Sequence, residues 1–311
     1  MKDNNLKNTA TGQTSKVLIP VDFSSNDPLS VKVGFELANR LEQEAVLLHA
    51  SVIASPMIEP QFPDDFNGID NESAELEEIE LDNEIHEIDS KNFTALSRDI
   101  NILQKKGELP ELKYSTALTP GMPEETIAAF CEENPVSVIV MTTRGRERRS
   151  EELVGSVTAE VIDHSFAPVM SVPESYTFEG FQNIINICAF CFCDEGDFQA
   201  LTKLMNMFHN PKVKIFLFPA NDKIKGNELN ERLSSFSKRL SETYSNSSFV
   251  APTLAEKFNF REETEKYFKE NSIQMTLVPN RKRNAIARFF HPGLAHKILY
   301  EIDFPMLAIP V

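Results

Sequence analysis

The fold that we expect for this chain follows from residues 141–158, which read Met141-Thr-Thr-Arg-Gly-Arg-Glu-Arg-Arg-Ser-Glu-Glu-Leu-Val-Gly-Ser-Val-Thr158. A mostly β-branched apolar run, 136–140, precedes it, and apolar residues recur at helical spacing from Val157 onward. The order is therefore strand, polar loop and helix. Gly145 can adopt backbone angles closed to other residues, and backbone N–H groups at the start of the helix, near Gly155, are free to bind an anion. We interpret the stretch as a candidate phosphate site.

The loop also carries side chains that suit a phosphate. Ser156 and Thr158 offer hydroxyl donors, and charge-assisted hydrogen bonds from guanidinium groups would hold a multiply charged anion. The arginines around the loop are Arg144, Arg146, Arg148 and Arg149. The alternative is that the glycine serves a turn common to parallel α/β proteins and that the arginines are only solvated. Composition alone does not decide between the two.

The spacing is more specific than the composition. Gly145, nine further residues and then Gly155-Ser156 resemble the phosphate loop of the universal stress protein family, whose usual pattern is Gly-x2-Gly-x9-Gly-Ser/Thr. Thr142 stands where that pattern has its first glycine. The resemblance implies nucleotide contacts in this stretch at Met141, Thr142, Arg144, Gly145, Gly155, Ser156, Val157 and Thr158.

The first strand supplies a second part of the expected site. Residues 16–25 form an apolar run that ends in Asp22 and hydroxyls, and a helix is predicted from about Pro28 to Leu41. In an open parallel sheet, ligands bind beyond the carboxyl ends of the strands, which is where Asp22 would lie. A helix cap is the alternative role for Asp22 and Ser24.

The resemblance favours a ligand-binding role for Asp22. Pro-Val-Asp-x-Ser at 20–24 looks like the first strand of the family, and Ala-Val-Leu-Leu-His-Ala-Ser at 45–51 looks like its second. The resemblance implies adenine and ribose contacts at Pro20, Val21, Asp22 and Ala50. We interpret His49 as a structural residue at the end of the strand rather than a catalyst.

Strands and helices alternate along the whole chain. Further strands are predicted at 112–117, 136–140 and 167–173, and a helix at 123–133 begins with proline and acids, as helix N-termini prefer. This alternation predicts an α/β fold with a doubly wound parallel sheet. Residues 15–174 fill one such unit, after a tail at 1–14.

The second half repeats the first weakly. A shift of 137 aligns 135–173 with 272–310 without a gap, whereas 16–18 aligns with 183–185 at a shift of 167. We therefore expect a degenerate second domain at 181–311 after a linker at 175–180. Both would be five-stranded, Rossmann-like sheets similar to the adenine nucleotide alpha hydrolases. We expect them to dock as an intrachain pseudo-dimer through 169–173 and 306–310, which would cover both apolar edges.

The register of the repeat predicts that the second half has lost the site. Proline lacks an N–H donor and lysine cannot easily replace a turn glycine, so nucleotide is not expected there. The correspondences are Gly145 with Lys282, Gly155 with Pro292, Ser156 with Gly293 and Asp22 with Ala189.

An acidic segment interrupts the first half. Residues 64–89 contain twelve acids and no lysine or arginine, in a chain of net charge −16. Apolar residues within it form a broken helical stripe, which predicts an acidic loop followed by an amphipathic helix toward Lys106, an insertion at about 56–90. The segment is a solvated face or an arm for a basic protein partner. Its charge argues against nucleic-acid binding.

The remaining features of the sequence argue against a disulfide framework, a metal site and a membrane protein. Four cysteines are too few and too clustered for a disulfide framework, and Cys188-x-x-Cys191-x-Cys193 lacks a nearby fourth metal ligand, so we interpret these cysteines as core. No apolar run reaches the length of a membrane span, and residues 1–15 lack the features of a signal peptide, which predicts a cytoplasmic protein.

The sequence thus predicts a stress-response regulator that binds ATP or another adenine nucleotide, to which a magnesium ion could be added on the phosphates. No general base or nucleophile is identified, so enzymatic activity is uncertain and turnover would be slow at most. Two alternatives stay open, a nucleotide-free interaction protein with a relic phosphate loop and a slow ATPase. Further homodimerisation also stays open.

Overall fold

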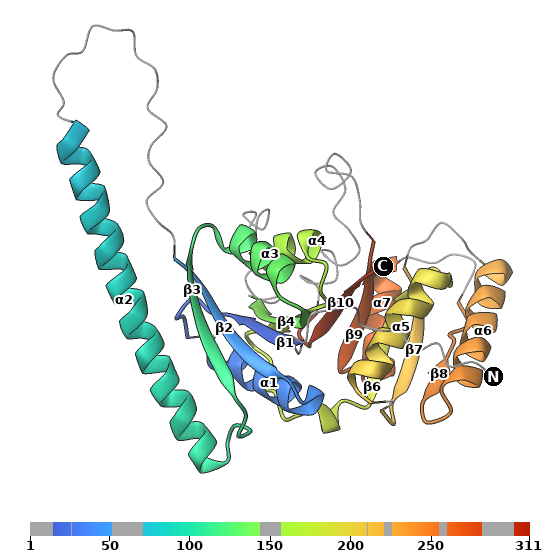
Figure 1. Cartoon of the computed structure of the whole chain (residues 1–311). Helices are drawn as coiled ribbons and strands as arrows, with labels where there is room; N and C mark the ends of the chain where they lie inside the picture. The colour runs from blue at the N-terminus through green and yellow to red at the C-terminus, as the bar shows by residue number, and fades with distance from the viewer. Residues whose placement is uncertain are drawn as a thin grey trace, which may run out of the picture.

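The computed structural model describes residues 15–25, 27–51, 71–143, 157–209, 211–220, 226–254, 260–281 and 302–311. Within these ranges the side chains of 71–83, 260 and 261 are not described. The described strands form one ten-stranded sheet in the order β3-β2-β1-β4-β5-β10-β9-β6-β7-β8. Helices cover both faces of this sheet (Figure 1).

The first half contains five strands and four helices among its described residues. In chain order they are β1 (Lys16–Pro20), α1 (Asp27–Leu41), β2 (Glu44–Ser51), α2 (Asn71–Lys106), β3 (Tyr114–Pro120), α3 (Pro123–Glu133), β4 (Val136–Thr143), α4 (Val157–His164) and β5 (Val169–Pro173). All neighbouring strands in this half are parallel. The doubly wound parallel sheet predicted from the alternation of strands and helices is therefore confirmed.

The second half repeats this arrangement. Its described elements are a 3-10 turn at Phe181–Asn183, β6 (Asn186–Cys191), α5 (Glu195–Met207), β7 (Lys214–Pro219), α6 (Gly226–Thr243), β8 (Ser248–Val250), α7 (Phe260–Glu270), β9 (Met275–Asn280) and β10 (Met306–Pro310). The pairs β6–β7, β7–β8, β6–β9 and β9–β10 are all parallel.

The two halves join through β5 and β10, which pair antiparallel with Val169 opposite Ala308. The predicted docking through 169–173 and 306–310 is confirmed, and it converts two sheet edges into one continuous sheet. The junction has side-chain bonds as well: Ser171 Oγ donates to the Met306 carbonyl at 3.4 Å, and Asn280 Nδ2 donates to the Ile162 carbonyl at 2.5 Å.

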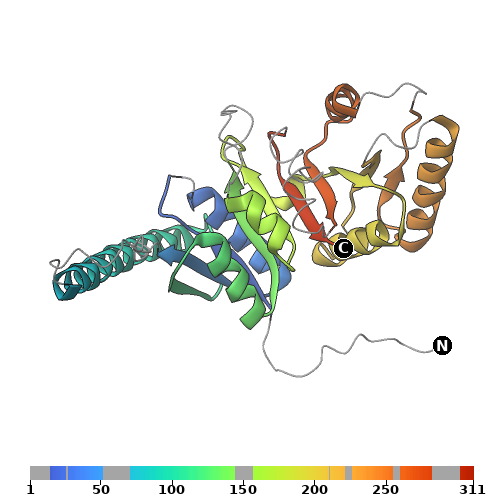
Figure 2. The ribbon, with the colours of Figure 1, turned by 90° about the horizontal axis from the view of Figure 1, so that it is seen from above.

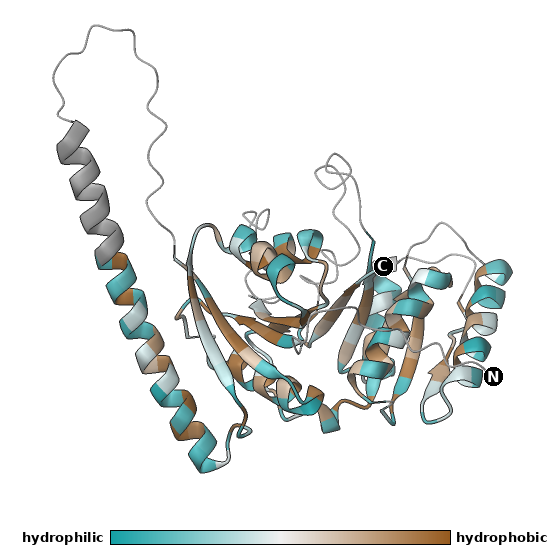
Figure 3. Ribbon diagram, in the orientation of Figure 1, coloured by the Kyte–Doolittle hydropathy of each residue, from teal (hydrophilic) through white to brown (hydrophobic). Residues whose placement is uncertain are grey.

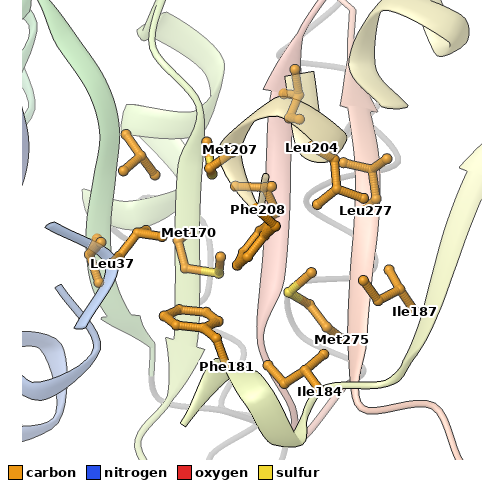
Figure 4. Packing of buried hydrophobic residues seen from close by; sticks show 14 of the residues in the cluster. Leu37, Met170, Phe181, Ile184, Ile187, Leu204, Met207, Phe208, Met275 and Leu277 are labelled. Carbon is orange, nitrogen blue, oxygen red and sulfur yellow. The ribbon is translucent and has the colours of Figure 1, made fainter. Parts of the chain in front are cut away.

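A hydrophobic core crosses this junction. Figure 4 shows Leu37 and Met170 of the first half packed near Phe181, Phe208 and Met275 of the second. Phe181 is further fixed by its backbone N–H, which donates to Glu36 of α1 at 2.7 Å. Figure 3 shows largely apolar strands between helices that carry both polar and apolar residues. The two halves therefore share a hydrophobic core in addition to the strand pairing between β5 and β10.

Helix α2 departs from the repeat. It has 36 residues, whereas its counterpart α6 has 18. Phe93 and Ile100 are buried against the first half, but Ile88 is 49% exposed, so the predicted apolar stripe is not buried along its whole length. The N-terminal part of α2, which carries most of the acidic segment, extends beyond the sheet (Figures 1 and 2).

Candidate functional site

A cavity of about 230 Å³ lies at the carboxyl ends of β1, β2 and β4. The chain runs from β1 to β2 and β3 on one side, then returns to β4 on the other side of β1. This is the switch point at which open α/β sheets bind their ligands. The predicted site residues that line the cavity are Pro20, Val21, Asp22, Ala50, Met141, Thr142, Val157 and Thr158.

These eight are all the predicted site residues that the structure describes. Arg144, Gly145, Gly155 and Ser156 lie outside the described residues, as do Arg146, Arg148 and Arg149. The structure thus brings together residues that are spread over more than a hundred positions of the sequence, from Pro20 to Thr158. That these residues bind a nucleotide stays a prediction.

Thr142 belongs to β4, where it pairs with Val172 of β5. Its backbone is that of a strand, in which a β-branched residue is favoured. Thr158 of α4 donates from Oγ1 to the Thr142 carbonyl at 3.2 Å, which ties the first turn of α4 to the end of β4. The family's first glycine is therefore not required here for backbone conformation.

Sequence reasoning missed five further residues of the cavity wall. Leu48 and Ile127 are buried and supply an apolar surface, as small-molecule sites usually do. The full set of missed residues is Asp27, Leu48, His49, Pro123 and Ile127. The alternation of β2 could have indicated Leu48, which shares a strand face with Ala50, and the position of His49 next to Ala50 at the strand end could have indicated His49.

Asp27 is the first residue of α1 and is only 5% exposed. Its Oδ1 accepts the backbone N–H of Asp22 at 3.4 Å. Among the residues that the structure describes, its Oδ2 has no hydrogen-bond partner. Burial, and then repulsion by the Asp22 carboxylate, raise the pKa of Asp27 to about 7.

Asp22 itself is exposed and holds a tight turn. Its Oδ1 accepts the backbone N–H of Ser24 at 3.0 Å, and Phe23 between them has a left-handed φ of 59°. The helix begins at Asp27, so Asp22 does not cap it directly. The turn leaves the Asp22 side chain at the cavity rim, next to Asp27.

His49 has the structural contact that its position predicted. Its Nδ1 lies 2.8 Å from the Val21 carbonyl, and its ring stacks on Phe23 at 4.4 Å between centroids. Its Nε2 is 3.5 Å from Asp89 Oδ2 of α2, which also accepts a bond from Ser51 Oγ at 2.5 Å. This cluster of His49, Ser51 and Asp89 anchors α2 beside the cavity.

Strand register corrects the alignment of the two halves. β4 and β9 do follow a shift of 137, since Ile139 pairs with Val169 and Thr276 with Met306. However, Val17 pairs with Val138 and Ile187 with Met275, so β1 matches β6 at a shift of 170 (17 to 187) rather than 167. Asp22 therefore corresponds to Phe192 and not to Ala189. The apolar runs 16–18 and 183–185 look alike, but the latter precedes the strand.

In the corrected alignment, Asp197 of the second half is equivalent to Asp27 of the first. Asp197 Oδ2 accepts the backbone N–H of Phe192 at 2.6 Å, as Asp27 accepts that of Asp22. Arg281 follows β9 and donates to Asp197 Oδ1 at 2.8 Å and to Asp194 Oδ1 at 2.7 Å. Its guanidinium also lies 4.5 Å over the Phe192 ring. Side chains of the protein therefore fill this position in the second half.

All three clustered cysteines were predicted to be core, and the prediction is confirmed for the first two but not for Cys193. Cys188 and Cys191 are buried, while Cys193 is half-buried and lies 3.8 Å from Cys191 between sulfur atoms. Within the described ranges, no group of three or more His, Cys, Asp or Glu side chains is arranged to hold a metal ion.

A larger groove of about 630 Å³ lies between α2 and β3. None of the predicted site residues lines it, and it is at the outer edge of the sheet rather than at the switch point. We therefore place the candidate site at the smaller cavity. In the part of the chain that the structure describes, no helix is long and apolar enough to cross a membrane.

Comparison with known proteins agrees with this geometry. Residues 13–173 match the model of the universal stress protein family. A universal stress protein of Methanocaldococcus jannaschii is 32% identical over 160 residues, which cover 50% of this chain and 93% of the relative. These comparisons concern the half that contains the cavity.

Two solved structures resemble the whole chain in fold. A universal stress protein from Archaeoglobus fulgidus superposes with a TM-score of 0.65 at 13% identity and covers 95% of this chain and 98% of its own. A Pseudomonas aeruginosa protein named for the same family gives a TM-score of 0.56 at 10% identity, over 96% and 94% of the two chains. At these identities the likeness extends to the fold alone.

Proposed function

Because the chain belongs to the universal stress protein family, we propose that its first half binds ATP or another adenine nucleotide and that the protein acts as a cytoplasmic stress-response regulator. In this proposal the nucleoside lies over β1 and β2, against Pro20, Val21, Asp22 and Ala50. The phosphates lie over the end of β4 and the start of α4, against Met141, Thr142, Val157 and Thr158. The sequence pattern assigns Arg144, Gly145, Gly155 and Ser156 to the phosphates as well.

One observation carries the proposal. Eight residues chosen from three separate motifs line a single cavity at the switch point of the sheet. A chance resemblance of short motifs would not be expected to bring them into one cavity. The wall has an apolar side for a base and a hydroxyl-bearing side near the start of a helix, which suits an anion.

Regulation by occupancy fits the site better than turnover. Among the described residues of the cavity, His49 bonds to the Val21 carbonyl through Nδ1 and lies beside Asp89 through Nε2. None of the described residues that line the cavity with it is a serine or cysteine. A general base for water attack would need to reach the reacting phosphate. A magnesium ion, if present, would be held mainly by the phosphates.

Two measurements on the purified full chain test the proposal. One sample is denatured and any base that co-purified is identified. A second, native sample is titrated with ATP in a calorimeter. The informative variant is Ala50→Leu, because a larger side chain there would occupy the cavity. Its matched control is Ala220→Leu at the equivalent position of the second half, directly after β7, at a shift of 170. We expect binding by the wild type and the control and a loss of at least ~10-fold in Ala50→Leu. Absence of binding by an empty wild-type protein would overturn the proposal.

A nucleotide-free interaction protein is the second candidate, and α2 favours it. The helix is twice as long as its counterpart, and its acidic N-terminal part extends beyond the sheet. In this alternative, a basic protein partner binds the acidic part of α2 by electrostatic attraction. If ATP does not bind, this reading becomes the leading one, and steady release of ADP by the purified protein would instead support a slow ATPase.

A further inference from the structure

The structure has a buried aspartate at the equivalent position of each half, and the two copies differ in what their second carboxylate oxygen contacts. Asp27 is the first residue of α1 and Asp197 the third of α5, and each accepts a backbone N–H from the residue five positions earlier. The second oxygen of Asp197 is occupied by Arg281 at 2.8 Å. The second oxygen of Asp27 has no partner among the described residues.

Asp27, which carries this unpartnered oxygen, belongs to the wall of the cavity. Asp27 lines the cavity together with Pro20 and Asp22, while 95% of its surface is removed from solvent, since it is 5% exposed. A buried carboxylate oxygen without a donor is costly, and native proteins seldom retain one without a function. In the second half the protein supplies the donor itself, through Arg281.

Resting on the proposed function, we propose that Asp27 reads the nucleoside part of the ligand: its Oδ2 accepts a hydrogen bond from an O–H or N–H group of the bound nucleoside. The same acid sets the orientation of the ligand, because a phosphate beside Asp27 and Asp22 would be repelled. The phosphates therefore lie on the far side of the cavity, toward Thr142 and Val157. Asp27 is a specificity-determining residue that neither the motif at 20–24 nor the phosphate loop includes.

Asp27→Asn is the sharpest variant. The amide oxygen of asparagine can keep the bond to the Asp22 N–H, so its NH2 group faces the cavity. There it would meet the hydrogen-bond donor of the nucleoside, and two donors cannot bond to each other. A hydrogen bond to a charged group is worth ~10- to 100-fold in affinity, so ATP should bind at least ~10-fold more weakly. Asp99→Asn, on the exposed face of α2, makes the same change in net charge and should bind as the wild type does.

The test is calorimetric titration at pH 8.5, where Asp27 is ionised. ATP is compared with analogues that lack the 2′-hydroxyl, the 3′-hydroxyl or the 6-amino group. One analogue should bind the wild type as weakly as ATP binds Asp27→Asn and lose nothing further in the variant, which identifies the donor by a double-mutant cycle.

The outcomes separate this inference from the proposed function. A wild-type protein that binds no adenine nucleotide overturns the proposed function, and this inference with it. A wild type that binds ATP while Asp27→Asn binds it within twofold overturns the inference alone. An equal loss for ATP and every analogue also overturns it, because Asp27 would then shape the cavity without contacting the nucleoside.

Discussion

Val169 of β5 and Ala308 of β10 lie opposite each other in the antiparallel pair that joins the two halves into one sheet. Both residues are buried, at 1% exposed each. The pairing satisfies the backbone groups of two edge strands that would otherwise be open to other chains. The second half therefore supplies the first with a partner that a single-domain protein would have to find in another molecule.

The first half alone should associate with itself. Residues 1–183 keep Phe181 on α1 but leave the edge of β5 and the apolar Met170 uncovered. We expect a dimer through antiparallel β5 pairing in sedimentation experiments, whereas the full chain does not use this edge. Ser171→Lys should weaken the dimer, because a charge on an edge strand opposes pairing. A stable monomer of 1–183 would contradict this expectation.

Stability should depend on pH through Asp27. Its pKa is about 7 in the folded protein against about 3.9 when unfolded, so between these values the folded state binds more protons. The free energy of unfolding therefore falls as pH rises through this window, and the cost is complete above pH 7. Asp27→Asn removes the charge and should be more stable without ligand, by on the order of 2–4 kcal/mol at pH 8.5.

Urea unfolding from pH 5 to pH 8.5 measures this difference. The advantage of the variant should grow with pH and level off near pH 8. An advantage that is independent of pH would show that Asp27 is not the titrating group. Combined with weaker ATP binding, a more stable variant would mean that the protein retains a destabilising charge for its site.

Local patterns in the sequence were sufficient for the fold of the first half, and the resemblance to the family supplied eight of the described residues of the cavity wall. Alternating apolar runs predicted each strand of the first half, and the helix at 123–133 begins and ends as predicted. The motif residues line one cavity because carboxyl ends of neighbouring parallel strands meet at one edge. Asp27 was missed because an acid at the start of a helix is ordinary, and only the structure shows that it is buried.

The alignment of Asp22 with Ala189 was wrong for a related reason. Apolar residues at 183–185 resemble the first strand, but 181–183 form a 3-10 turn and the strand begins at Asn186. Sequence similarity between short apolar runs cannot separate a register of 167 from one of 170. Strand pairing can, because Ile187, Cys188 and Ala189 of β6 each have a fixed neighbour in β9.

Arg281 and Asp197 should depend on each other. Arg281→Met leaves the Asp197 carboxylate, which is 1% exposed, without its guanidinium partner. We expect a loss of about 1–3 kcal/mol in the free energy of unfolding, toward the lower end because the Arg281 side chain is 35% exposed. Adding Asp197→Asn should recover part of the loss. Additive effects in this double-mutant cycle would show that the pair contributes no interaction energy.

Helix α2 should loosen when its anchor is removed. Asp89 is buried, accepts a bond from Ser51 and lies beside His49, so Asp89→Ala removes this partner from the Ser51 hydroxyl and from Nε2 of His49. We expect a cost of about 1–2 kcal/mol and faster hydrogen exchange in 84–106, while the amides of β1 stay protected. Glu87→Ala, which breaks an exposed pair with Lys91, is the control and should leave exchange unchanged. Because His49 also lines the cavity, Asp89→Ala should weaken ATP binding as well, whereas the control should not. Equal exchange in both variants would show that α2 is held by its apolar contacts alone.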